Sequence, residues 1–144
     1  MRKVNVKEVK TKREMDDFVR LTERLYAGCP YYVPDMDTDI RDTFAPRKNA
    51  GLDFSEIQPF IAYDENGNVV GRIAGIVNHR ANEKWHTKNV RFGFIDKDVS
   101  AALLEAVEHW GRERGMDCIQ GPMGIFDFDK EGMLIEDFDK LGSM

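Results

Sequence analysis

The stretch QPFIAYDENGNVVGRIAGIVNH, residues 58–79, predicts a tight β-hairpin, and the rest of the fold is inferred outward from it. Its first strand covers Phe60–Tyr63 and its second covers Val69–Asn78. Between them, Asn66 and Gly67 tolerate the positive φ angles of a short hairpin turn. The stretch therefore predicts two neighbouring antiparallel strands.

The chain after the hairpin predicts a third strand of the same sheet. HRANEKWHTK, residues 79–88, has the composition of a polar connection, and NVRFGFI, residues 89–95, has that of a strand. Gly93 inside this strand indicates a β-bulge or the close approach of another group to the backbone.

A helix and a further strand follow. Asp98 or Ser100 is the expected N-cap, and Gly115 ends the helix. The expected buried stripe comprises Leu103, Leu104, Val107, Trp110 and Gly111. MDCIQGPMG, residues 116–124, then reads as a buried strand, and a strand–helix–strand series predicts a right-handed crossover between parallel strands.

The chain before the hairpin predicts a strand and two helices. VNVKEVK, residues 4–10, alternates apolar and polar residues, as a short strand does. Thr11 and Glu14 have the spacing of a capping box and open a helix that Gly28 ends. We expect one side of this helix to carry Met15, Phe18, Val19, Leu25 and Tyr26.

A second, shorter helix is expected between Asp35 and Phe44, in a segment with three prolines. Asp35 and alternate residues after it imitate the start of a calcium loop. That reading fails because position six would be Ile40 rather than Gly and position twelve is Pro46. Carboxylates near a helix N-terminus explain the aspartates instead.

Composition limits the function classes. The chain has 144 residues, of which 42% are hydrophobic and 33% charged, as in a single globular domain. A net charge of −5 argues against a general nucleic-acid binder. Cys29 and Cys118 lack metal-ligand spacing and are expected to be free core thiols, with no metal site and a cytoplasmic location as the default. No apolar run approaches the length of a membrane span.

Four blocks in this order resemble a bacterial branch of the GNAT (N-acetyltransferase-like) superfamily. They are PYYVP (30–34), GRIAGIVNHRANEKW (71–85), VRFGFID (90–96) and GPMGIFDFDKEGMLIEDFD (121–139). The resemblance covers nearly the whole chain. It implies an α/β fold in three layers, with helices on both faces of a mixed central sheet.

The resemblance also implies a cofactor, acetyl-CoA or another acyl-CoA, whose acyl group passes to a small-molecule amine. Backbone groups of Phe92, Gly93, Phe94 and Ile95 would face the pantetheine arm. The pyrophosphate loop would contain Lys97, Asp98, Val99, Ser100 and Ala101, but this loop lacks the glycines of the family's Q/R-x-x-G-x-G/A pattern. Asp98, and Asp96 just before the loop, would compete with a pyrophosphate for the same amides.

Two functions from different classes therefore remain open. One is acyl-CoA-dependent N-acyl transfer; the other is a degenerate GNAT-fold module that binds or assembles without coenzyme A. Inherited fold and Gly93 favour the first, whereas the missing glycines and the aspartates favour the second.

Candidate catalytic residues follow from residue type. Glu83 or His79 would be the base that deprotonates the amine, and Tyr32, with Tyr31 beside it, would line the acceptor site or donate to the leaving thiolate. Purely structural roles are the alternatives: a solvated loop for Glu83 and His79, and packing aromatics for Tyr31 and Tyr32. His109 is expected on the outer side of its helix.

The C-terminal part is acidic and short. Asp127, Asp129 and Glu131 suit a divalent ion or a polyamine by type, although a charged turn explains them as well. The residues after Gly124 are too few for the helix and two strands that close a GNAT domain, so the chain resembles the front part of a longer member. An uncovered strand edge predicts a homodimer.

Overall fold

The computed structural model describes residues 3–95, 99–126 and 129. The elements, in chain order, are β1 (Asn5–Glu8), α1 (Lys12–Leu25), α2 (Asp37–Thr43), the 3-10 helix η1 (Ala50–Asp53), β2 (Ser55–Tyr63), β3 (Val69–Asn78), α3 (His79–Trp85), β4 (Asn89–Gly93), α4 (Ser100–Glu113) and β5 (Cys118–Gln120).

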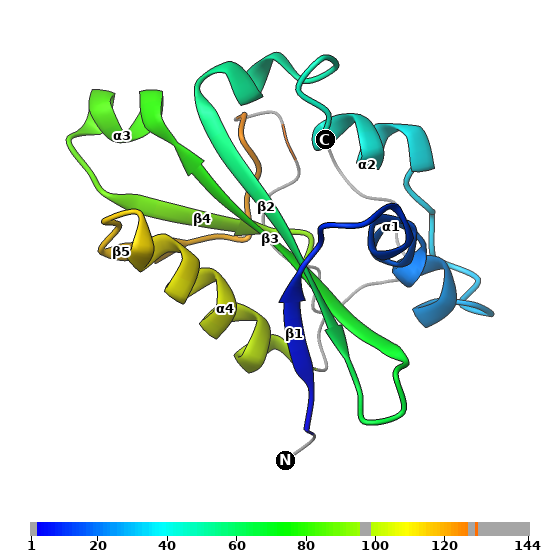
Figure 1. Cartoon of the computed structure of the whole chain (residues 1–144). Coiled ribbons are helices and arrows are strands. Elements are labelled where there is room, and N and C mark those ends of the chain that lie inside the picture. The colour runs from blue at the N-terminus through cyan, green and yellow to red at the C-terminus, as the bar shows by residue number, and fades with distance from the viewer. Residues whose placement is uncertain (1–2, 96–98, 127–128, 130–144) are drawn as a thin grey trace.

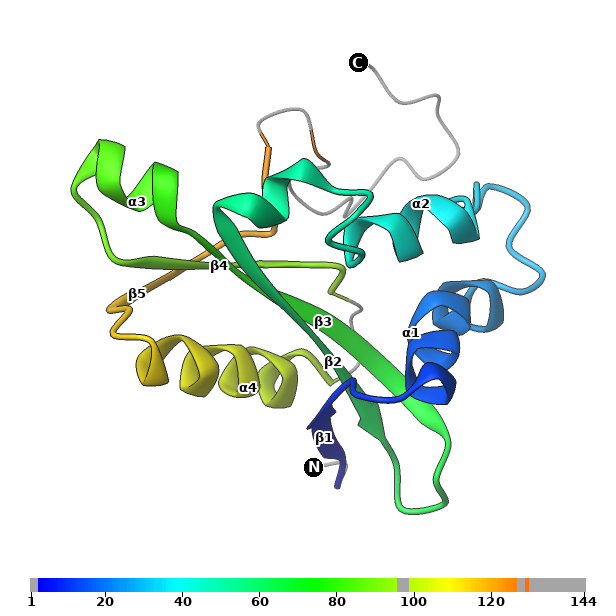
Figure 2. The ribbon, with the colours of Figure 1, turned by 45° about the horizontal axis from the view of Figure 1, so that its top comes forward.

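The five strands form one mixed sheet in the order β1-β2-β3-β4-β5. The first three pairings are antiparallel, and β4 pairs with β5 in parallel. Helix α4 covers one face of the sheet, and α1 and α2 cover the other (Figures 1 and 2). The predicted three-layer α/β architecture with a parallel crossover is confirmed.

Each face has its own core, because successive side chains of a strand point to opposite faces. On the α4 face, Ile73 and Val77 of β3 pack with Val107 and Trp110. The opposite face buries Phe18, Val19, Ile40 and Ile61, with Val9 beside them.

The N-terminal helix begins as predicted but buries a different set of residues at its end. The Glu14 amide donates to Thr11 Oγ1 at 3.2 Å, and the Thr11 amide donates to Glu14 Oε1 at 3.0 Å, which completes the capping box. Leu25 and Tyr26 are 44% and 39% exposed because the helix ends there and the chain turns away. The prediction that they share the buried side is therefore wrong.

The segment expected to be a polar connection contains a helix, α3. Asn78 caps it, since its Oδ1 accepts from the Ala81 amide at 3.0 Å, and His86 in the left-handed region ends it. The side chains of α3 are half-buried or exposed, so the stretch lacks the apolar periodicity by which a helix is recognised.

The start of α4 and the strand β5 also differ from expectation. Helix α4 has Val99 as its N-cap, which offers no side-chain acceptor, and Ser100 is the first residue of the helix rather than its cap. Asp98, the other candidate for the cap, lies outside the described residues. The final strand β5 has only three residues and is half-exposed, not buried, because it lies at the edge of the sheet. Cys118 on this strand and Cys29 are free thiols but exposed.

Candidate functional site

A cavity of about 790 Å³ lies on the α1/α2 side of the sheet, next to the end of β4. Its floor consists of Ile57 of β2, Arg72 and Ile76 of β3, and residues 93–95. Helix α2 and residues 48–50 form one side, and the chain after β5 forms the other. The volume is within the roughly 300–1,000 Å³ typical of small-molecule sites.

Three of the residues predicted to bind the cofactor line this cavity together: Gly93, Phe94 and Ile95. The β3–β4 pairing stops at Gly93, and Phe94 has a φ of 56°. Non-glycine residues seldom adopt this left-handed conformation, and it turns the backbone out of the ladder. The pairing ends at Gly93 without a shift in register, so the bulge that Gly93 was one reason to expect is not found, and the positive φ lies one residue later.

The close approach that Gly93 predicted is confirmed. A Cβ atom at Gly93 would lie 2.9 Å from the carbonyl oxygen of Met123, which is closer than side chains tolerate. The Met123 amide donates to the Phe92 carbonyl at 2.9 Å. The chain after β5 thus runs directly along the end of β4.

Residues 121–126, the cavity-wall segment, are fastened to the sheet by side chains. Arg91 Nη1 donates to the carbonyls of Gly124 at 3.1 Å and Ile125 at 3.3 Å. Asn78 Nδ2 also donates to the Ile125 carbonyl, at 3.2 Å. In Figures 1 and 2 the orange part of the chain runs from β5 toward η1, and Phe126 packs edge-on against Phe54 there.

The floor contains a buried cation. Arg72 is 3% exposed, and its Nη1 donates to the Phe18 carbonyl at 2.8 Å. Its guanidinium lies over the rings of Phe18 and Phe94, 5.1 Å and 5.6 Å from their centroids. These contacts fix the positive charge beside the backbone turn at Phe94.

Helix α2 presents carboxylates to the mouth of the cavity. Asp39 and Asp42 are three residues apart and therefore share a helix face. Helix α2 is held against α1 by burial of Ile40, which also lines the cavity, and by an ion pair of 2.7 Å between Arg41 and Asp16. Within the described chain, the carboxylates of Asp39 and Asp42 make no hydrogen bond or ion pair.

Of the aspartates at this mouth, Asp39 was predicted only as part of a charged helix start, and Asp42 was given no role. Their role as cavity lining was missed, because nothing local in the sequence shows which face of α2 meets the sheet. The spacing of Asp35, Asp39 and Asp42, which recurs at helical intervals, was the available signal.

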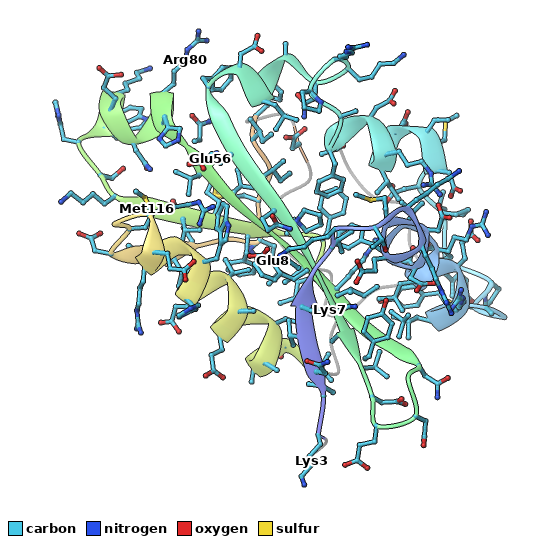
Figure 3. The ribbon with its side chains drawn as sticks, in the orientation of Figure 1. Lys3, Lys7, Glu8, Glu56, Arg80 and Met116 are labelled. Atoms are coloured by element: carbon cyan, nitrogen blue, oxygen red, sulfur yellow. The ribbon has the colours of Figure 1, made fainter. Side chains whose placement is uncertain are left out.

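The predicted catalytic residues lie away from this cavity lining. His79 opens α3, and its Nε2 is 3.0 Å from Glu56 Oε2. Glu83 is exposed on the same helix. Figure 3 shows Arg80 on α3 and Glu56 on β2. Tyr32 stacks on Tyr26, with centroids 4.9 Å apart, in the loop between α1 and α2.

Of the remaining predicted cofactor residues, Phe92 lies in β4, whereas Val99 and Ser100 lie at the start of α4. Val99 is buried against β3, where a Cβ at Gly71 would meet its side chain, and Ser100 is the first residue of the helix. Lys97 lies outside the described residues, as do Asp127 and Glu131 of the acidic cluster. Asp129 lines the cavity, and its Oδ2 accepts from the Phe126 amide at 2.9 Å.

Among the described residues, no group of histidine, cysteine or acidic side chains is arranged to hold a metal ion. No helix in this same part of the chain is long and apolar enough to cross a membrane.

No protein-family model matches the chain. Two curated proteins do. "Protein YghO" of Escherichia coli is 30% identical over 132 residues, which cover 89% of this chain and 33% of that protein. "Bacterial ceramide synthase" of Caulobacter vibrioides is 30% identical over 141 residues, 94% of this chain and 36% of that protein. The chain thus spans about a third of the length of these relatives.

Two solved structures share the fold. A chain from Pyrococcus furiosus, provisionally named an acetyl transferase, has a TM-score of 0.50 and 14% identity over 94% of this chain and 99% of its own. A GNAT-family acetyltransferase from Staphylococcus aureus has a TM-score of 0.52 and 16% identity, covering 81% of this chain and 71% of its own. At these identities the similarity concerns the fold.

Proposed function

Since this chain has the GNAT acetyltransferase fold, we propose that it belongs to an enzyme that transfers an acyl group from acyl-coenzyme A to an amine. The observation that carries this proposal is the cavity beside Gly93, Phe94 and Ile95, at the point where β4 leaves the sheet. A thioester positioned along this backbone would have its carbonyl next to a space large enough for an acceptor.

The name of one relative supports an amine acceptor. Ceramide is a fatty-acid amide of a long-chain base, so a ceramide synthase joins an acyl group to an amine nitrogen. In such a transfer the nitrogen attacks the thioester carbon, the carbon–sulfur bond breaks, and coenzyme A leaves as its thiol. The nitrogen loses a proton to a base during this exchange.

The carboxylates of the cavity are better placed for this base than the residues predicted from sequence. Asp39 and Asp42 line the same space as Phe94, whereas Glu83 and His79 belong to α3. A base must come within hydrogen-bond reach of the proton that it accepts. We therefore assign this role to the α2 carboxylates.

Calorimetric titration tests cofactor binding with three probes: coenzyme A, acetyl-CoA and dodecanoyl-CoA. The proposal predicts saturable heat and a raised melting temperature at ligand concentrations below about millimolar. If none of the three produces heat or a thermal shift at millimolar concentration, the acyltransferase proposal is wrong.

A second function, a module with the fold but without coenzyme A, is favoured by the cavity-wall segment. The Phe92 carbonyl already accepts from Met123, along the strand edge where the resemblance puts the pantetheine. In this alternative the chain's own backbone occupies the cofactor's place.

Arg91→Met separates the two functions because it removes the bonds from Arg91 to Gly124 and Ile125. If the segment yields to a cofactor, this variant binds coenzyme A several-fold more tightly than the parent, since fewer bonds must break. Arg112→Met is the matched control, because Arg112 is exposed on α4 and its side chain pairs, among the residues that the structure describes, only with Glu108. Absence of binding in the parent and in Arg91→Met supports the module.

A further inference from the structure

The cavity combines an apolar interior with an acidic mouth. Ile40, Ile76 and Ile125 are each buried, and Ile57 and Ile95 add partly buried surface. The carboxylates of Asp39 and Asp42 are exposed to solvent. A ligand that fits this gradient has an apolar chain and a polar end that stays in water.

The charges around the cavity select the sign of that polar end. Four carboxylates line the space, on Asp35, Asp39, Asp42 and Asp129, against the two cations Lys48 and Arg72. Asp129 is engaged by the Phe126 amide, and Asp35 has an interaction of its own. Asp39 and Asp42 have none among the described residues, so their charge is available to a ligand.

The position of Arg72 bears on where in the cavity a cationic group is favoured. Its buried guanidinium lies at the floor, in contact with Phe18 and Phe94. A cationic end is therefore favoured beside the carboxylates at the mouth rather than beside the guanidinium at the floor, because opposite charges attract. A hydrocarbon chain has no such preference and gains from leaving water.

We propose that this cavity binds a single-chain aliphatic amine as its ammonium form, with the chain against the isoleucines and the ammonium between Asp39 and Asp42. The proposal rests on the proposed function, because it names the class of acceptor. Binding of the amine nevertheless requires no coenzyme A, so the two are tested separately.

Four probes test it by calorimetry: octylamine, octanol and octanoate, which have the same number of carbons, and propylamine, which has a shorter chain. We expect octylamine to bind more tightly than octanol, and octanoate and propylamine to bind at least tenfold more weakly than octylamine. Along a series from propylamine to octylamine, affinity should rise about two- to fourfold per methylene, as burial of a CH₂ group implies.

Variants on α2 locate the ammonium. Asp39→Asn combined with Asp42→Asn should weaken octylamine binding at least fivefold and leave octanol binding unchanged. Asp37→Asn is the matched control, because Asp37 is on the same helix but does not line the cavity. An equal effect of Asp37→Asn would show only the long-range charge of an acidic protein and would overturn the assignment.

The outcomes remain distinct from those for acyl-CoA. Octanoate binding as tightly as octylamine, or propylamine binding as tightly as octylamine, overturns the inference even if acyl-CoA binds. Octylamine binding with the predicted selectivity, without any acyl-CoA binding, supports the inference and overturns the proposed function.

Discussion

The two faces of β3 are packed in opposite ways. On the α4 face, glycines bring the helix close: a Cβ at Gly75 would lie 2.9 Å from Trp110 Cε3, and one at Gly111 would lie 2.7 Å from Val90 Cγ1. On the other face, Ile76 and Arg72 border a cavity of about 790 Å³. The same strand thus packs tightly against α4 on one face and borders the cavity on the other.

This difference separates stability from function. In a close-packed interface, adding or removing an atom lowers the free energy of unfolding, because the neighbouring side chains relax only in part. A face with a pre-existing cavity tolerates changes in volume and offers a surface to a ligand. We therefore expect substitutions on the α4 face to affect unfolding most and those on the cavity face to affect binding most.

The largest effect should come from Ile73→Ala, compared with Ile76→Ala on the same strand. Both side chains are almost fully buried, at 0% and 1% exposure, so burial alone predicts equal losses. Ile73→Ala should cost about 3–4 kcal/mol of unfolding free energy, because it opens a void in a dense core. Ile76→Ala should cost at least about 1 kcal/mol less, since it only enlarges an existing space.

Urea denaturation measures both losses. Equal losses, or a greater loss for Ile76→Ala, would contradict the contrast between the two faces.

The next effect concerns the glycine contact between β3 and α4. Gly75→Val should destabilise the domain by about 1–3 kcal/mol, because the new methyl groups would overlap the ring of Trp110. The loss should shrink by about 1 kcal/mol when Trp110→Leu is present, since the shorter side chain leaves room. A double-mutant cycle from urea unfolding checks this, and identical losses in both backgrounds would show that the contact is not the cause.

The smallest effect belongs to the start of α1, at the margin of the cavity-bearing face. A hydrogen bond from Lys7, followed by one from the Lys10 amide, lowers the pKa of Glu14 from its usual 4.5 to about 2. A lowered pKa stabilises the fold above pH 4.5, and this contribution disappears as the pH falls toward 2. Figure 3 shows Lys7 on β1, the strand just before this helix.

Glu14→Gln should therefore lower the melting temperature near neutral pH, and the difference from the parent should narrow between pH 4.5 and about 2. Glu105→Gln, an exposed change on α4, is the control and should have little effect. A difference for Glu14→Gln that stays constant over this range would exclude ionisation of Glu14 as its source.

The sequence by itself determined the elements whose causes are local. The Asn66-Gly67 turn, the capping box of Thr11 and Glu14, and the apolar stripe of α4 each depend on residues a few positions apart, and each is found in the structure. Helix α3 was missed because its seven residues bury nothing, so its only local signal was the Asn78 cap.

Only the tertiary structure decided where the cavity lies and what lines it. Its floor, its acidic side and its wall come from residues as distant as Asp39, Ile76 and Met123, which meet through the packing of α2 and the hydrogen bonds of Arg91. Gly93 predicted that some group approaches β4, but it did not identify this group as the chain's own Met123. Contacts between distant segments depend on how faces pack, and no periodicity along the chain encodes that.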